Sequence, residues 1–261
     1  MRHYYTTPNS LLTEYVRTVL IIEGFSESCS QDLPIFTNGL PTLFCRTKKD
    51  QSSGFERIVQ LTLYGMSAPP ECWVTDEKTT VIAWFFKPFV LPALFNISAK
   101  DLKIAPVEFS HLSPHKFNSI KTQIAYADST TQKKEVIENL ILEYLNQHSR
   151  TCKIIQSATE QIMNNPGGHI MAGVIEDQNI TERTFQRIFK KFVGVTPTQF
   201  RRICQFQQSF GQLRSKQFSK VSDVAFDNHF SDQSHFIRSF KEFAQTTPND
   251  YLKKGLTGKG K

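Results

Sequence analysis

Apolar and polar positions in the first half of the chain follow the pattern of strands joined by polar turns. Four stretches rich in β-branched and aromatic residues predict strands: residues 16–22, 40–45, 58–64 and 81–86. The polar segment 48–54 ends in glycine and is typical of a turn. Residues 1 to about 130 therefore predict a mixed, mainly β domain, with one short helix at 91–96.

From residue 133 the apolar spacing becomes helical. Within 133–147, five residues fall on one helical face: Ile137, Leu140, Ile141, Tyr144 and Leu145. After a short linker at 150–153, the pattern predicts helices at 154–162, 169–177, 181–192, 199–213, 221–226 and 234–243. Thr181 is the expected N-cap of the third of these, and Gly194 and Pro197 end it. The predicted fold class is α+β, with a β-rich domain at 1–149 and an all-α domain at 150–261.

The all-α part contains an internal repeat. The segment from Arg187 to Phe200 recurs 51 residues later, from Arg238 to Tyr251, with six identical positions. In each copy a short helix precedes the repeat, at 169–177 and 221–226. Two short helices and a turn, twice over, are the sequence form of a tandem helix-turn-helix.

Each copy has an apolar rear and a polar front. Phenylalanines at i, i+4 and i+7 predict the buried rear: Phe185, Phe189 and Phe192 in the first copy, and Phe236, Phe240 and Phe243 in the second. The candidate DNA-binding residues form the front: Arg183, Gln186, Arg187 and Lys190, then Gln233, Ser234, His235, Arg238 and Lys241. Arginine and glutamine can reach base edges, whereas lysine, serine and helix N-termini suit phosphates. A recognition helix in the major groove needs this division.

Charge favours an anionic partner for the helical part. Residues 1–149 hold 14 basic and 15 acidic side chains, a net charge of −1, and residues 150–261 hold 17 and 9, a net charge of +8. Nucleic acid and acidic membranes are the usual partners of such a part. The most apolar run, 81–97, contains Lys87, Pro88 and Pro92 and is too short to span a bilayer, so no membrane partner is expected. The N-terminus has no signal-peptide core, and we expect a cytoplasmic location.

The cysteines do not form a recognisable motif. They are odd in number and contain no CxxC pair: Cys29, Cys45, Cys72, Cys152 and Cys204. This argues against a disulfide framework or a structural zinc site, and free buried thiols are expected.

Residues 154 to 253 resemble the AraC/XylS family of transcription regulators. The most specific part is the segment from Phe226 to Lys241 followed by Thr247 and Pro248, which is similar to the family's second-unit signature. The resemblance implies two helix-turn-helix units joined by one long helix, here 199–213. It also implies that both recognition helices enter successive major grooves on one face of double-stranded DNA. A regulator of this kind is expected to act on RNA polymerase.

Some residues depart from the family pattern. His229, preceded by Asn228, stands where glycine is expected, and Asn179 occupies the first turn. Such turns usually need a positive φ, which asparagine and histidine tolerate better than most residues. Ile175 replaces a small residue that Ala225 keeps in the second copy. Gln205 and Ser209 stand where arginine and alanine are usual, which would change the salt bridges of the long helix.

The N-terminal region is similar to the cupin-like regulatory domain of one branch of these regulators, at the turn 36–40 and the stretch 83–88. Its histidines, His3, His111, His115 and His148, lack the spacing of a cupin metal site, so we expect no metal and no cofactor. Five aromatic residues could line a ligand pocket or belong to the core: Trp73, Trp84, Phe85, Phe86 and Phe95. The helix at 133–147 could pair two subunits in a homodimer or pack on its own domain.

The expected function is a non-enzymatic, sequence-specific transcription regulator whose N-terminal domain is a sensor or dimerisation domain. A small-molecule effector is one alternative for its control. A second is a protein-interaction module without a small ligand. The third, a cupin-like enzyme fused to DNA-binding helices, needs a convergent polar site that the sequence does not offer.

Overall fold

The chain folds into two compact units. The computed structural model describes residues 2–24, 40–66, 79–95, 97, 99, 102, 105–147, 153–167, 173 and 180–257. The first unit is built mainly from residues up to 147, and the second mainly from residues that begin at Lys153. The predicted domain boundary at 149/150 falls outside the described residues and stays a prediction.

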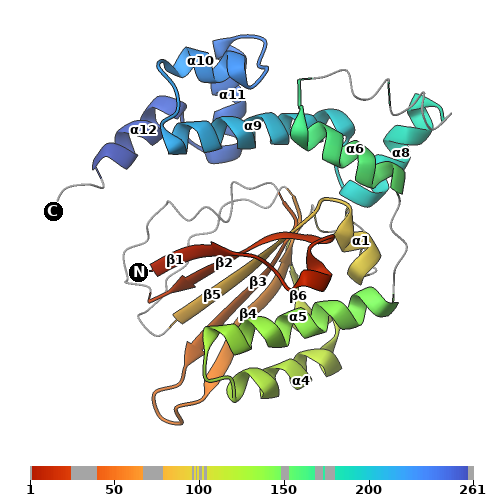
Figure 1. The fold of residues 1–261 in the computed structure, drawn as a ribbon, viewed down its shortest axis with the longest axis vertical. Coiled ribbons are helices and arrows are strands. Elements are labelled where there is room, and N and C mark those ends of the chain that lie inside the picture. The colour runs from red at the N-terminus through yellow and green to blue at the C-terminus, as the bar shows by residue number, and fades with distance from the viewer. Residues whose placement is uncertain are drawn as a thin grey trace. The chain divides into compact units, whose positions relative to one another are not determined.

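The first unit combines an antiparallel sheet with helices (Figure 1). Its elements in chain order are β1 (Arg2–Thr6), η1 (Ser10–Leu12), β2 (Val16–Glu23), β3 (Thr42–Lys49), β4 (Glu56–Tyr64), β5 (Thr79–Phe86), α1 (Val90–Phe95), β6 (Val107–Glu108), α3 (Phe109–Leu112), α4 (Pro114–Ala125) and α5 (Thr130–Gln147). The strand order is β1-β2-β5-β3-β4-β6, and every pair of neighbours is antiparallel. This confirms the four predicted strands and the β-rich N-terminal region.

Burial explains why β5 lies at the centre of the sheet. All its residues except Thr80 are buried, so both faces of the strand are covered. Such a strand is a nearly continuous apolar run rather than an alternating one. Trp84, Phe85 and Phe86 are fully buried in it, and Phe95 of α1 is buried beside Phe86, with ring centroids 6.2 Å apart. The described aromatic residues of the proposed pocket are therefore core residues, and Trp73 lies outside the described residues.

Helix α5 packs on its own domain. Ile137, Leu140, Ile141 and Tyr144 of its predicted apolar face are buried, and Tyr144 contacts the ring of Phe95 at 5.0 Å. Figure 1 shows α5 beside α4, which contacts it. Of the two alternatives for this helix, the structure favours packing within one chain over pairing of two subunits.

Glu138 ties α5 to the sheet and to the start of the chain. The residue is 2% exposed, and its Oε1 accepts hydrogen bonds from Trp84 Nε1 and from the Asn9 backbone amide, both at 3.3 Å. Its Oε2 pairs with Lys134 Nζ at 3.0 Å. One carboxylate thus joins three segments that are far apart in sequence.

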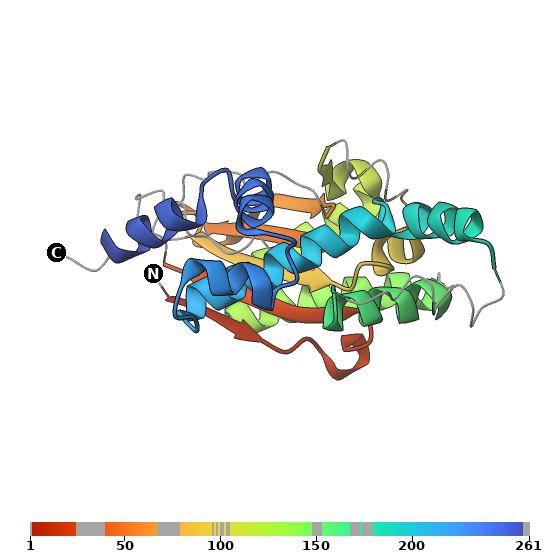
Figure 2. The same ribbon diagram turned by 90° about the horizontal axis from the view of Figure 1, so that it is seen from above.

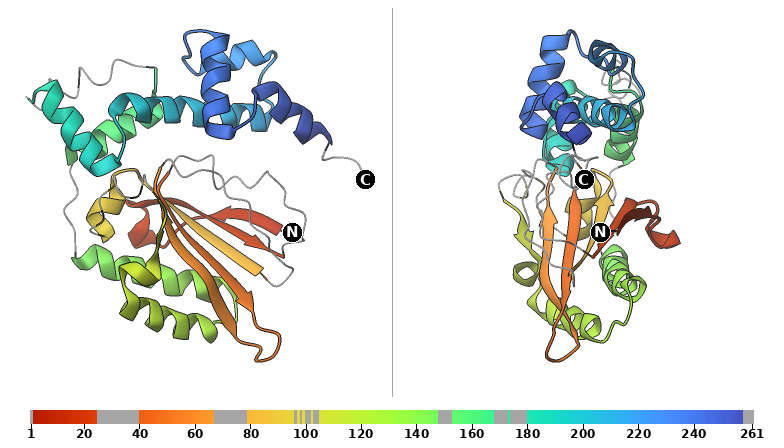
Figure 3. Two further views of the ribbon diagram at one scale, coloured as in Figure 1. Left: turned by 180° about the vertical axis from the view of Figure 1, so that it is seen from behind. Right: turned by 90° about the vertical axis from the view of Figure 1, so that its left-hand side faces the viewer.

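The second unit is entirely helical over its described residues. Its elements are α6 (Lys153–Asn164), α8 (Glu182–Val193), α9 (Pro197–Ser215), α10 (Val221–Asp227), α11 (Gln233–Ala244) and α12 (Pro248–Thr257). Figures 2 and 3 show the long helix α9 with α8 at one end and α10, α11 and α12 toward the other. The predicted helix at 169–177 lies almost wholly outside the described residues, and Lys153, predicted as linker, is the first residue of α6.

Six elements were not predicted from the sequence: β1, η1, β6, α3, α4 and α12. Strand β1 is an edge strand without a buried position, so its pattern is weak. Helix α4 buries only Ile120 and Ile124. Its signal was Pro114 at the first helical turn, a position that favours proline. Helix α12 likewise begins at Pro248.

Replacement of Glu138 is expected to destabilise the first unit. Glu138→Ala leaves the Trp84 and Asn9 donors without their acceptor and should cost about 3 kcal/mol, because removing one partner of a buried ion pair is expensive. Glu138→Gln keeps an acceptor oxygen and should cost about 1 kcal/mol. Urea unfolding followed by tryptophan fluorescence measures both.

The matched control is Glu143→Ala, on the same helix. Glu143 pairs with Lys116 at 3.3 Å but its side chain is 63% exposed, so its loss should cost no more than about 1 kcal/mol. Equal destabilisation by Glu138→Ala and Glu143→Ala would contradict the role assigned to Glu138.

Candidate nucleic-acid interface

The helix bounds reproduce the sequence repeat residue for residue. Helix α8 spans Glu182–Val193 and α11 spans Gln233–Ala244, an offset of 51 at both ends. The next helices, α9 and α12, begin at Pro197 and Pro248 with the same offset. The two segments are therefore copies of one structural unit, and both fold as helices as predicted.

The ends of the repeated helices are also equivalent. Thr181 and Asp232 cap α8 and α11, accepting hydrogen bonds from the amides of Thr184 at 3.3 Å and His235 at 2.7 Å. At the other end, Gly194 and Gln245 both adopt the left-handed region, with φ of 86° and 54°. Glycine takes this conformation without strain, and its use after a helix is a common end signal.

Phenylalanine rings form the predicted rear of each helix. In the first helix-turn-helix unit, Phe189 contacts Phe185 and Phe200 with ring centroids 5.6 Å apart in both cases. In the second helix-turn-helix unit, Phe240 contacts Phe236 at 5.8 Å and Tyr251 at 6.1 Å. Phe185, Phe189, Phe236 and Phe240 are fully buried. Phe192 and Phe243, the third members, are only partly buried because they lie one turn nearer the helix ends.

Helix α9 supplies the support for the second unit. Phe206 of α9 is buried and contacts Phe240 at 5.3 Å and Phe243 at 5.1 Å. An ion pair between Arg202 of α9 and Glu242 of α11, 2.5 Å apart, also joins the two helices. The rear of α11 is thus fixed by packing, which leaves its other face open.

The predicted front faces are open to solvent. All four candidates in the first helix-turn-helix unit are exposed: Arg183, Gln186, Arg187 and Lys190. In the second helix-turn-helix unit four of the five candidates are exposed: Gln233, Ser234, Arg238 and Lys241. Because Arg187 and Arg238 occupy the same position in two copies of one unit, each presents its guanidinium from the same place on its helix.

His235 is the exception among these residues. It is only partly buried, its ring lies 5.4 Å from that of Phe230, and its Nδ1 is 3.2 Å from the Ser231 hydroxyl. The side chain therefore packs toward the turn that precedes α11. It lies at the edge of the front face, where the turn meets the helix.

The turn of the second unit has the expected backbone. His229 adopts a φ of 61°, in the left-handed region that favours glycine. The Nε2 of Gln205 donates to the His229 carbonyl oxygen at 2.9 Å, so this departure from the family pattern gives a hydrogen bond to the turn. Ser209, the other departure on α9, is buried and donates to the Phe206 carbonyl at 2.7 Å. The corresponding first turn, with Ile175 and Asn179, lies outside the described residues.

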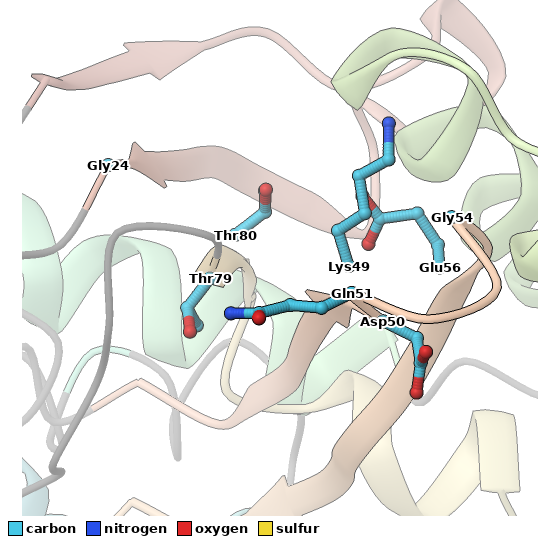
Figure 4. Close-up of a pocket in the computed structure, with 8 residues that line it drawn as sticks. All are labelled: Gly24, Lys49, Asp50, Gln51, Gly54, Glu56, Thr79 and Thr80. Atoms are coloured by element: carbon cyan, nitrogen blue, oxygen red, sulfur yellow. The ribbon is translucent and has the colours of Figure 1, made fainter.

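The N-terminal compact unit, which contains the sheet, has a cavity of about 370 Å³ that is lined by polar residues and glycine. Its lining, drawn in Figure 4, consists of Gly24, Lys49, Asp50, Gln51, Gly54, Glu56, Thr79 and Thr80. The chain itself engages both acidic groups. Glu56 pairs with Lys133 at 2.8 Å, and Asp50 accepts hydrogen bonds from Ser52 and Ser53, which hold its pKa well below the ordinary range. Of the aromatic residues proposed for a pocket, none of those that the structure describes lines this cavity.

The described part of the chain contains no group of three or more His, Cys, Asp or Glu side chains that could hold a metal ion. No described helix has the length and apolar character needed to cross a membrane. Cys45 and Cys204 are buried and are not part of a disulfide, and burial raises the pKa of the Cys45 thiol to about 12.

Comparisons with known proteins point to one domain type. Residues 176–254 match the family model described as a helix-turn-helix domain. The Transposon Tn10 TetD protein of Escherichia coli is 25% identical over 132 residues, which is 50% of this chain and 94% of that protein. The residues of the family-model match include α8 to α11 and the beginning of α12, and therefore both copies of the repeat.

Solved structures of one protein are similar over most of the chain. The 1.65 Å structure of ToxT from Vibrio cholerae is 13% identical with a TM-score of 0.42, covering 97% of this chain and 98% of that one. ToxT from strain O395 is 14% identical with a TM-score of 0.42, covering 90% and 95%. Wild-type ToxT from strain SCE256, bound to unsaturated fatty acid, is 12% identical with a TM-score of 0.40, covering 96% and 93%.

Removal of the Asp232 cap is expected to destabilise α11 in a pH-dependent way. The hydrogen bond from the His235 amide, followed by that from the Ser231 hydroxyl, lowers the pKa of Asp232 below its ordinary 3.8. A carboxylate with a lowered pKa stabilises the fold above its unfolded pKa, and this contribution is lost as the pH falls through the folded value. The difference in Tm between the wild type and Asp232→Ala should therefore shrink between about pH 7 and about pH 3.

Asp232→Asn is the control, because its amide oxygen can cap without a titratable group. Its Tm difference from Asp232→Ala should persist at acidic pH. A difference between the wild type and Asp232→Ala that did not change with pH would show that the charge of Asp232 does not stabilise α11.

Proposed function

We propose that this chain, which belongs to the AraC/XylS family of DNA-binding transcription regulators, reads its operator with two recognition helices. Helices α8 and α11 would enter successive major grooves on one face of the DNA. The observation that carries the proposal is the common offset of 51 residues in both helices, which gives Arg187 and Arg238 equivalent exposed positions.

The exposed side chains suit two kinds of contact. Arg187 and Arg238 can each donate two hydrogen bonds to guanine O6 and N7, and Arg183 and Gln186 add further donors for base edges. Lys190 supplies a positive charge that suits phosphates without reading sequence. In the second helix-turn-helix unit, Gln233 would contact bases, while Ser234, His235 and Lys241 would contact the DNA backbone.

Charge supports the same assignment. The net charge of +8 over residues 150–261 would attract the DNA backbone and release its counterions. The net charge of −1 over residues 1–149 gives the first unit no such attraction. DNA binding is therefore proposed for the C-terminal helical unit alone, and it requires no catalysis and no cofactor.

We assign the control of DNA binding to the N-terminal compact unit. Its sheet and helices have their own core, which is what a separately acting regulatory domain needs. A small-molecule effector or the formation of a homodimer would act through this unit, and RNA polymerase is the proposed target of the bound regulator. The cavity at Lys49 and Glu56 is one place in the described residues where a small polar ligand could enter.

Substitution of either arginine is expected to weaken specific binding. Arg187→Ala and Arg238→Ala should each cost about 1–3 kcal/mol on a duplex that the wild type selects from a random library, and should relax the preference at one base pair. Arg238→Lys keeps the charge but not the paired donors, so it should relax the same preference. Lys190→Ala should weaken all duplexes alike and reduce the slope of log affinity against log salt by about one. Fluorescence anisotropy titrations at several salt concentrations measure these effects.

Lys153→Ala removes the same charge from an exposed residue of α6, outside both recognition helices, and serves as the control for Lys190→Ala. It should leave the slope of log affinity against log salt unchanged. If Arg238→Ala bound the selected duplex as the wild type does, the second helix-turn-helix unit would not read bases.

The role of the first unit is tested by its response to ligands. If it senses a small molecule, the full chain should melt at a higher temperature in one of a series of fractionated metabolite pools, because a ligand that binds only the folded state stabilises it by mass action. At a concentration of 100 times Kd the stabilisation is about 2.7 kcal/mol. Unchanged melting in every pool would instead favour the alternative in which this unit binds another protein.

A further inference from the structure

The turn before α11 is held from two sides. His229, at its centre, adopts a φ of 61°, which a non-glycine residue keeps only where the surroundings fix it. On the side that faces α9, Gln205 has only 4% of its surface exposed, and its Nε2 donates to the His229 carbonyl oxygen at 2.9 Å. One residue earlier, Asn228 Nδ2 donates to Gln212 Oε1 at 2.6 Å and to the Val224 carbonyl at 2.8 Å. Two glutamines, two helical turns apart on α9, thus anchor this turn.

The other side of the turn meets the beginning of the first helix-turn-helix unit. The His229 imidazole lies directly against Gly167, in the turn that follows α6. A Cβ atom built on Gly167 would overlap the Cγ, Nδ1 and Cδ2 atoms of the ring. The end of α6 is fixed in addition by Gln208 of α9, whose Nε2 donates to the Met163 carbonyl at 2.9 Å. The segment that leads into the first unit therefore touches the turn that positions the recognition helix of the second.

We propose that His229 is a positioning residue that joins the two helix-turn-helix units and sets the distance between their reading faces. The inference rests on the proposed function, since a fixed distance matters only if both helices read the same duplex. A glycine at this position would keep the turn, because it accepts the same φ without strain. It would remove the imidazole that lies between the two units. The histidine thus restricts the half-site spacing that the protein binds.

The consequence for DNA follows from helix geometry. One extra base pair between two half-sites separates them by about 3.4 Å and rotates one against the other by about 35°. Two rigidly joined reading faces cannot follow this change, whereas two loosely joined faces can. Half-site spacing is therefore a readout that a purely stabilising role of His229 would not alter.

The test uses the full chain and four duplexes. The first is the duplex that the wild type selects from a random library, and the others carry one inserted base pair between the half-sites, a scrambled first half-site or a scrambled second half-site. The variants are His229→Gly, Gly167→Ala and the double variant. Gly211→Ala is the matched control, since nothing lies within 4 Å of a Cβ built on this exposed glycine of α9. Melting curves accompany every variant.

Two results are expected. His229→Gly should bind each scrambled duplex as the wild type does, but its preference for the selected spacing should fall from about tenfold to about twofold. Gly167→Ala should lower affinity for the selected duplex about tenfold through overlap with the imidazole, and addition of His229→Gly should restore most of it. Gly211→Ala should bind all four duplexes as the wild type does, while its melting temperature should rise slightly because alanine favours the helix.

Other results would overturn the proposal. If His229→Gly kept the full spacing preference, or if His229→Gly failed to rescue Gly167→Ala, the imidazole would not couple the units. A loss of melting temperature in His229→Gly without a change in spacing preference would assign it a structural role only. If the wild type selected a single half-site, the proposed two-groove reading would fail, and the coupling with it. If the wild type selected two half-sites but tolerated the inserted base pair, the coupling alone would fail.

Discussion

The burial of phenylalanine on the rear of α8 and α11 is the constraint on which the rest of the second unit depends. A short helix has too little intrinsic stability to hold an arginine in a fixed direction, and most of its stability must come from packing of its apolar face. Phe189 against Phe200, and Phe240 against Phe206 and Tyr251, provide that packing in the two copies. With the rear fixed, the residues on the opposite face, Arg187 and Arg238 among them, remain exposed.

The same constraint explains how two units act as one reader. Helix α9 presents Phe200 to the first unit and Phe206 to the second, so one helix supports both. A polar layer adds to the rings: Gln205 and Gln208 lie one turn apart on α9 and donate to backbone carbonyls of the second turn and of the end of α6. Apolar burial supplies the affinity of the helices for each other, while these directional hydrogen bonds fix the register.

Much of this architecture could be predicted from the sequence because its causes are local. Phenylalanines at i, i+4 and i+7 define a buried helical face, and Thr181, Gly194 and Pro197 mark helix ends, so α8 and α11 were predicted within two residues. The positive φ of His229 followed from the family resemblance. Helix α4 was missed because only Ile120 and Ile124 face inward. Contacts between distant residues were also missed, such as those of Glu138 with Asn9 and of Gln205 with His229, since no periodicity along the chain encodes them.

Protection of guanine N7 from dimethyl sulfate is the most direct test of the central claim, because this atom lies in the major groove where each recognition helix would sit. The account predicts two protected clusters on one face of the selected duplex, with centres about 10 base pairs apart. A single protected cluster, or two clusters on opposite faces of the duplex, would contradict it.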